Sequence, residues 1–222
     1  MGCGWNAQGS VGSVSGAVPA WAHEMPEIHP HDPALLLAGE TECVRLAEVL
    51  APWLADGVEH VGSTAVAGLA AKPIIDLMAS VRDLDEVVGQ ATDGLAADGW
   101  CYVPPELDQR PWRRFFVKPD QSRQRRVAHL HLIQAGHPRW ADQLAFRDAL
   151  RGDEQLARRY GDLKRLLAGR HADDREAYSA AKAAFVANAL AGHAAEPPAL
   201  PLRSYPGKPG ASAGHRRTEP IR

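Results

Sequence analysis

Hydrophobic residues in the first half of the chain follow both helical and strand patterns, whereas those in the second half follow the helical pattern alone. In the first half, helical spacing predicts a helix that begins at Asp32 and Pro33 and ends before Pro52, and another from Asp83 to Gly99. Short apolar runs predict strands at residues 58–61, 73–81, 100–103, 113–118 and 126–134. The last two runs enclose a charged segment, which predicts an antiparallel hairpin.

The second half follows only the helical period. Three segments predict helices, each ending in or near a glycine: residues 138–152, 153–169 and 173–192. We therefore expect an α+β fold. A mixed β-sheet with flanking helices is predicted for residues 26–136, and a C-terminal helical part, residues 137–192, is predicted to pack on this core.

The two ends of the chain differ from the rest in composition. Residues 1–25 are rich in Gly and Ser, and residues 193–222 are rich in Pro, Gly and Arg without any period. We expect a disordered leader over the first range and a disordered tail over the second.

Composition and charge exclude several classes of protein. The formal net charge of -2 predicts no nucleic-acid or membrane partner, and no apolar run approaches the roughly 20 residues that span a bilayer. The cysteines, Cys3, Cys43 and Cys101, are odd in number and widely spaced, which fits neither a disulfide framework nor a zinc knuckle. We expect a cytoplasmic protein, either a monomer or a homodimer.

A turn between the strands at residues 58–61 and 73–81 is a candidate phosphate site. Gly62 allows the backbone to approach a ligand, and Ser63 or Thr64 can cap the turn or donate a hydroxyl to phosphate. Lys72, just before the next strand, can add a positive charge. The alternative is an ordinary strand-to-helix turn, which also favours Gly and Ser.

Asp76 is a second candidate, because a carboxylate in the apolar run PIIDLMASV needs a cation, a donor or water. His129 and His131 lie two residues apart on a strand and so point to one face, where with a carboxylate they can hold a divalent metal or move a proton. His60 precedes the Gly-Ser turn. The alternatives are an aspartate that accepts backbone hydrogen bonds and half-buried strand histidines.

Arginines gather around the predicted hairpin. Arg113 and Arg114 begin its first strand, and either can line a phosphate or carboxylate site through its bidentate fork. The arginines at the hairpin tip are expected to be solvated.

Five blocks of the sequence, in the same order, resemble the GrpB family of small bacterial proteins. They are EHVGSTAVAGLAAKPIIDLM, RRFFVKP, HLHLI, W-x-x-x-L-x-F-R-D-x-L and DREAYSAAKAAFV. The resemblance covers about residues 26–192 and implies a minimal nucleotidyltransferase fold. In that fold a Gly-Ser turn holds a triphosphate, and a strand with Asp-x-Asp or Asp-x-Glu helps to hold two Mg²⁺ ions. Gly62, Ser63 and Asp76 match this signature.

The chain departs from that signature at Met78, which stands where the second carboxylate is expected and cannot bind Mg²⁺. The strand of the third carboxylate offers His129 and His131 instead. Hard Mg²⁺ prefers oxygen ligands, whereas imidazole suits Zn²⁺, Mn²⁺ or acid-base work. The expected cofactor is thus a divalent metal, Mg²⁺, Mn²⁺ or Zn²⁺, with Asp76 and these two histidines as its ligands.

Three functions are open on this basis. The first is a nucleotidyltransferase that moves a nucleotidyl group from a nucleoside triphosphate to a small acceptor. In it the Gly-Ser turn and Lys72 bind the phosphates, and Asp76 and His131 lie at the metal or the acceptor. The second is a non-catalytic nucleotide-binding or accessory module, because the resemblance extends to domains fused to dephospho-coenzyme A kinase. The third is a metal-dependent phosphoester hydrolase built from Asp76 and the three histidines.

Overall fold

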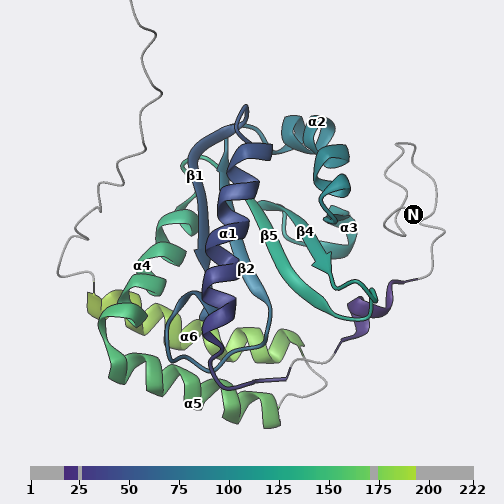
Figure 1. The fold of residues 1–222 in the computed structure, drawn as a ribbon. Helices are drawn as coiled ribbons and strands as arrows, with labels where there is room; N and C mark the ends of the chain where they lie inside the picture. Colours follow the sequence, from purple (N-terminus) through teal and green to yellow (C-terminus); the bar gives the residue numbers. More distant parts are fainter. Residues whose placement is uncertain (1–17, 25–26, 171–174, 194–222) are drawn as a thin grey trace, which may run out of the picture.

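The structure, a computed structural model, describes residues 18–24, 27–170 and 175–193. Most of the expected leader, residues 1–17, and residues 194–222 of the expected tail lie outside the described residues. Figure 1 shows the path of the chain and labels its helices and strands.

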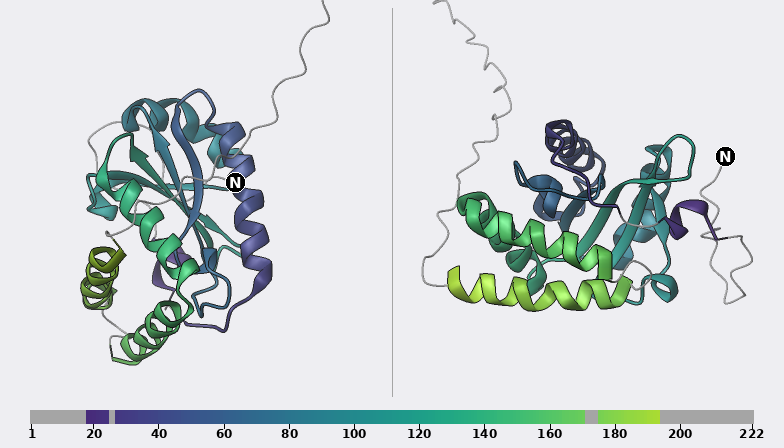
Figure 2. Two further views of the ribbon diagram at one scale, coloured as in Figure 1. Left: turned by 90° about the vertical axis from the view of Figure 1, so that its left-hand side faces the viewer. Right: turned by 90° about the horizontal axis from the view of Figure 1, so that it is seen from below.

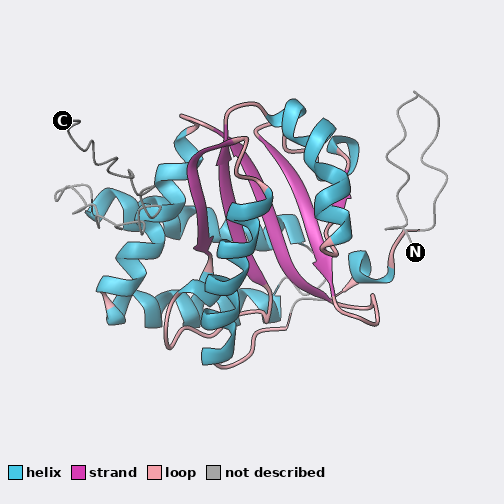
Figure 3. Cartoon of the chain, turned by 45° about the horizontal axis from the view of Figure 1, so that its top comes forward, coloured by secondary structure: helices cyan, strands magenta, loops and turns pink. Residues whose placement is uncertain are grey.

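Five strands form one mixed sheet, drawn in magenta in Figure 3. They are β1 Leu54–Val61, β2 Ile75–Val81, β3 Cys101–Val103, β4 Arg113–Pro119 and β5 Arg126–Gln134. Their order in the sheet is β1-β2-β5-β4-β3, in which β2 and β5 run parallel and the other neighbours run antiparallel. All five predicted strands are present, and the β4–β5 hairpin is confirmed. Strand β1 begins earlier than predicted because its pairing with β2 continues past an irregularity between Leu54 and Gly57.

One face of the sheet is covered by α1 Pro33–Val49 and α2 Leu84–Ala97. Both begin at the predicted N-caps: Asp32 accepts a hydrogen bond from the backbone N-H of Ala34, and Asp83 accepts two from the backbone at residues 85 and 86. A large apolar core fills the space between these helices and the sheet, with Leu46, Leu77 and Leu130 fully buried in it. This face is therefore structural.

The three C-terminal helices are α4 Pro138–Gly152, α5 Glu154–Arg170 and α6 Arg175–His193. They lie across the sheet from α1, as the two views of Figure 2 show. Phe146, Tyr160 and Phe185 join them in a second apolar core, which also takes in Val66 and Leu69 from the loop before β2. This second core joins the helical part to the loop beside the sheet. No described helix is both long and apolar enough to cross a membrane.

Two segments that were not expected to be regular form short helices. Residues Ala20–His23 form the 3-10 helix η1, in which Trp21 is buried against Cys101 and Val117, and Glu24 accepts a hydrogen bond from the backbone of Arg126. A disordered leader that extends to residue 25 is therefore wrong at these residues, because apolar burial holds them on the sheet. The polar loop before β4 contains α3, Pro105–Asp108.

The cysteines also differ among themselves. Cys43 on α1 is a free, half-buried thiol, whereas Cys101 on β3 is disulfide-bonded. The sequence did not predict this bond.

Candidate active site

Strand register brings the predicted carboxylate and histidines together. Asp76 on β2 is paired with Val61 on β1 and with His129 on β5, and His131 lies two residues further along β5. Paired residues on neighbouring strands point to the same face, and so do residues two apart on one strand. Asp76, His129 and His131 therefore share the face of the sheet that is turned toward the C-terminal helices.

The Asp76 carboxylate interacts with both histidines through one oxygen. Its Oδ1 atom lies 2.9 Å from Nδ1 of His129 and 3.9 Å from Nε2 of His131. Burial acts to raise the pKa of Asp76, but the hydrogen bonds and charges of the two histidines outweigh it and hold this pKa well below its ordinary value. Asp76 is thus ionised at neutral pH.

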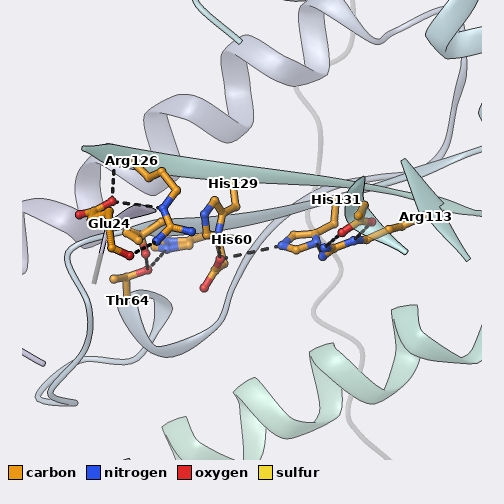
Figure 4. Close-up of polar contacts among 10 residues, drawn as sticks. Glu24, His60, Thr64, Arg113, Arg126, His129 and His131 are labelled. Atoms are coloured by element: carbon orange, nitrogen blue, oxygen red, sulfur yellow. Dashed lines mark hydrogen bonds and ion pairs between the residues drawn. The ribbon is translucent and has the colours of Figure 1, made fainter. Parts of the chain in front are cut away.

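Arg113 determines the tautomer of His131. The Nε atom of Arg113 donates to the Asp108 carboxylate at 2.8 Å, which holds the guanidinium in place. The Nη1 atom of Arg113 donates to Nδ1 of His131. Arginine has only donors, so Nδ1 of His131 must accept, and the proton of the neutral imidazole lies on Nε2, which faces Asp76. Burial, together with the charge of Arg113, lowers the pKa of His131 to about 4. At neutral pH His131 is therefore an uncharged donor. Figure 4 shows its contact with Arg113.

His129 has the opposite arrangement. Its Nδ1 atom faces the ionised Asp76, which requires the proton on Nδ1. The other nitrogen, Nε2, is buried and has no hydrogen-bond partner among the residues that the structure describes. An imidazole oriented by a carboxylate in this way presents a lone pair that can accept a proton or a hydrogen bond.

The Gly-Ser turn lies directly beside Asp76. Gly62 has a φ of 72°, and a Cβ atom at this position would lie 2.7 Å from Oδ2 of Asp76. Only glycine allows both the conformation and the close approach. Ser63 and Thr64 follow in the short helix η2, Ser63–Ala65; the Ser63 hydroxyl accepts from Lys164, and the Thr64 hydroxyl donates to the backbone carbonyl of Ile74.

These groups open into one cavity of about 840 Å³ between the sheet and the helices. Among the residues that the structure describes, the carboxylates of its lining are Asp76 and Asp108, and the second of these is bound by Arg113. Besides Arg113, its positive side chains are Lys72, Arg110, Arg126, Arg139, Lys164 and Lys182. The excess of positive charge favours an anionic ligand.

Two of the predicted site residues lie elsewhere. His60 points to the opposite face of the sheet, where it is buried under Gly39 of α1, and burial lowers its pKa to about 4. It reaches the turn only through a 3.0 Å hydrogen bond to the Thr64 hydroxyl. Arg114 forms an ion pair with Asp85 and does not line the cavity.

Sequence reasoning missed the contribution of the C-terminal helices. Lys164 from α5 is only 3 % exposed, and Lys182 from α6 lines the same cavity. Lys164 lies four residues after Tyr160 and three before Leu167, on the apolar face of its helix, and Lys182 lies in an alanine-rich segment. A charge on the packing face of a helix was the available signal.

Comparisons with known proteins agree with this architecture. A family model described as "GrpB protein" matches residues 25–191. The chain belongs to the GrpB family. It is 35% identical over 139 residues to UPF0157 protein YqkA of Bacillus subtilis, a match that covers 63% of this chain and 38% of YqkA. It is 40% identical over 171 residues to UPF0157 protein PA4798 of Pseudomonas aeruginosa, with 74% and 66% covered. The chain spans less than two thirds of the length of these two relatives.

A solved structure shows the same fold. The crystal structure of GrpB from Enterococcus faecalis matches with a TM-score of 0.65 and 30% sequence identity, covering 75% of this chain and 99% of that chain. The resemblance inferred from five sequence blocks is thus confirmed, and so is the α+β class with its mixed sheet and C-terminal helices.

Proposed function

We propose that the protein binds a nucleoside triphosphate in this cavity and transfers its nucleotidyl group to a small acceptor hydroxyl, with a divalent cation as cofactor. One observation carries the proposal: the Asp76, His129 and His131 cluster and the Gly62-Ser63 turn open into a single cavity with an excess of positive charge. Phosphates and a polarised acceptor are the groups that such a cavity fits.

The donor atoms fit a cation that arrives with the phosphates. Oδ1 of Asp76 faces the histidines, whereas Oδ2 lies beside Gly62 at the turn. Mg²⁺ is commonly held by one or two carboxylates together with substrate phosphates, so Asp76 would hold Mg²⁺ or Mn²⁺ through Oδ2. The bound cation would neutralise charge on the triphosphate.

The side chains of the site have distinct parts in the reaction. The acceptor oxygen would attack the α-phosphorus, the bond from that phosphorus to the bridging oxygen would break, and diphosphate would leave. His129 lines the cavity, and its Nε2 atom would take the hydroxyl proton while Asp76 stabilises the imidazolium. His131, an uncharged Nε2-H donor, would donate a hydrogen bond to a phosphoryl oxygen.

Thermal unfolding tests the binding part of the proposal. The purified protein is heated with each nucleoside triphosphate and with Mg²⁺, Mn²⁺ or chelator. A ligand at about a hundred times its dissociation constant adds roughly 2.7 kcal/mol, which for a chain of this size raises the midpoint by about 5 to 10 °C. We expect a shift that requires triphosphate and cation together. No shift with any nucleotide contradicts the proposal, and binding without turnover of any acceptor leaves only the non-catalytic module.

A second candidate is a metal-dependent phosphoester hydrolase, which one observation favours. Ligand atoms of Asp76, His129 and His131 all lie within 4.8 Å of one another, which suits a transition metal held by two imidazoles and a carboxylate. The contact from Arg113 opposes it, because coordination through Nε2 of His131 would place a proton on Nδ1 against another donor. Metal analysis separates the two candidates: a hydrolase of this kind retains a transition metal without any phosphate ligand, and the transferase does not.

A further inference from the structure

Two lysines from the C-terminal helices line the cavity, and one of them contacts the Gly-Ser turn. The ammonium group of Lys164, on α5, donates to the Ser63 hydroxyl at 2.7 Å and to the backbone carbonyl of Ala70. Lys182, on α6, lines the same cavity, and its charge acts on Lys164. Helices outside the sheet thus bring both positive charges to the cavity that contains Asp76.

Around these two lysines, positive side chains outnumber carboxylates among the described residues that line the cavity. The charge of Asp76 raises the pKa of both lysines, and the Oδ1 atom of Asp76 also faces two histidines. Burial lowers the pKa of Lys164 to about 7 and lowers the pKa of Lys182 as well. Burial opposes the charged form of both lysines, and an anionic ligand in the same cavity favours that form.

We infer that Lys164, Lys182 and the Ser63 hydroxyl form a subsite for the diphosphate or triphosphate part of a ligand. The inference rests on the proposed function in one respect, since it names the residues that would hold the departing diphosphate. The subsite makes the C-terminal helices part of the binding site.

The hydrogen-bonding capacity of these groups fits phosphate oxygens. An ammonium group has three N-H donors, and among the described residues Ser63 and Ala70 accept two of those of Lys164, whose ammonium also lies over the Tyr160 ring. A phosphate oxygen can accept the third. Because the Ser63 hydroxyl accepts from Lys164, its own proton is directed to another acceptor. Lysines act as point charges on phosphate, and two of them with a hydroxyl match the several oxygens of a polyphosphate.

Inorganic triphosphate is the direct probe, because it lacks a nucleoside and an acceptor. Its affinity for the full chain is measured by calorimetry at pH 6.5 and constant ionic strength with a chelator present. We expect wild-type protein to bind it, and Lys182→Met and Lys164→Met each to weaken binding by about tenfold or more. Lys182→Met is the decisive variant, because Lys164 also supports the loop carbonyl of Ala70.

Arg158→Gln is the matched control. Arg158 is on α5 like Lys164 but is 69 % exposed and paired with Glu154, outside the cavity. Removing its charge should leave the affinity for triphosphate within about twofold of the wild-type value, because exposed charges are screened.

The outcomes separate this inference from the proposed function. The subsite is overturned if the wild-type protein does not bind triphosphate. It is also overturned if the Lys182→Met variant binds triphosphate as well as the wild type does. If nucleotidyl transfer occurs and both lysine variants keep the wild-type KM, the transferase stands and the subsite falls. A third outcome is that the wild type binds triphosphate, the lysine variants bind it more weakly, and no nucleotidyl transfer occurs with any acceptor. In that case the subsite stands and the transferase falls.

Discussion

His129 on β5 lies with its Nδ1 atom 2.9 Å from Oδ1 of Asp76, its neighbour in register on the parallel strand β2. An ionised carboxylate at this distance orients the imidazole and determines which nitrogen carries the proton. His131 lies between His129 and Arg113 in Figure 4, and the Gly-Ser turn lines the same cavity as this pair.

Replacing Asp76 by Asn tests this pair. The amide keeps the shape of the side chain but removes the charge that would hold a cation and orient His129. We expect the shift in unfolding midpoint caused by triphosphate with cation to disappear, a loss of about 5 °C or more, while far-UV circular dichroism stays unchanged. Asp162→Asn, at an exposed carboxylate outside the cavity, is the control and should keep the full shift. A variant at Asp76 that binds everything the wild type binds would place the site elsewhere.

The arrangement at His131 can be observed directly by nitrogen NMR of the imidazole. We expect the Nε2-H tautomer at pH 7 and an uncharged ring until the pH approaches about 4, because burial and Arg113 lower its pKa. The double variant Arg113→Gln with Asp108→Asn removes both partners of the buried ion pair, so neither is left as an unpaired charge. In it the pKa of His131 should rise toward its ordinary value of 6.5. An Nδ1-H tautomer in the wild type would contradict the contact with Arg113.

Because α1 packs closely on β1, adding a single methyl group at Gly39 is expected to destabilise the fold. A Cβ atom at Gly39 would overlap the ring of His60, which is buried in the sheet and cannot easily move away. We expect Gly39→Ala to lower the free energy of unfolding by about 1 to 3 kcal/mol, as overpacking usually does. The measurement is urea denaturation.

Gly89 of α2 provides the control for that substitution. Nothing lies within 4 Å of a Cβ atom there, so Gly89→Ala should be neutral or stabilising by up to about 1 kcal/mol. In a protein that already carries His60→Ala, the substitution Gly39→Ala should lower the free energy of unfolding by less than it does in the wild type. Additive effects of the two substitutions would show that the ring is not the obstacle.

The buried ammonium of Lys164 predicts a dependence of stability on pH. Burial first, and then the charges of Lys182 and Arg165, lower its pKa from 10.5 to about 7, against the opposing effect of Asp76. Between these two values the unfolded chain binds more protons at this residue than the folded chain does, so the free energy of unfolding rises with pH there. Lys164→Met should lack this contribution.

The difference between wild type and Lys164→Met isolates the effect from other titrating groups. We expect the unfolding midpoint of the variant, relative to wild type, to fall as the pH is raised from about 6.5 to 9.5. A relative midpoint that is constant over this range would show that Lys164 keeps an ordinary pKa in the folded protein.

Much of the local structure was predictable because it depends on neighbouring residues. Asp32 and Asp83 cap their helices as expected, since a cap needs only a side chain and the next few backbone amides. His129 and His131 share a face because alternation along a strand is a local property. The disordered leader expected up to residue 25 was wrong at Trp21, whose order depends on burial against distant strands.

The sequence by itself determined the strands, the helices, the Gly-Ser turn and the presence of a carboxylate and two histidines on the strands that follow it. Only the tertiary structure decided which of these groups meet. His60 and Asp76 both flank the turn, yet the register of β1 and β2 sends them to opposite faces, because a shift of one residue reverses the face of a strand side chain. Lys164 and Lys182 join the site because α5 and α6 pack across the sheet, an arrangement set by apolar burial between segments far apart in the chain.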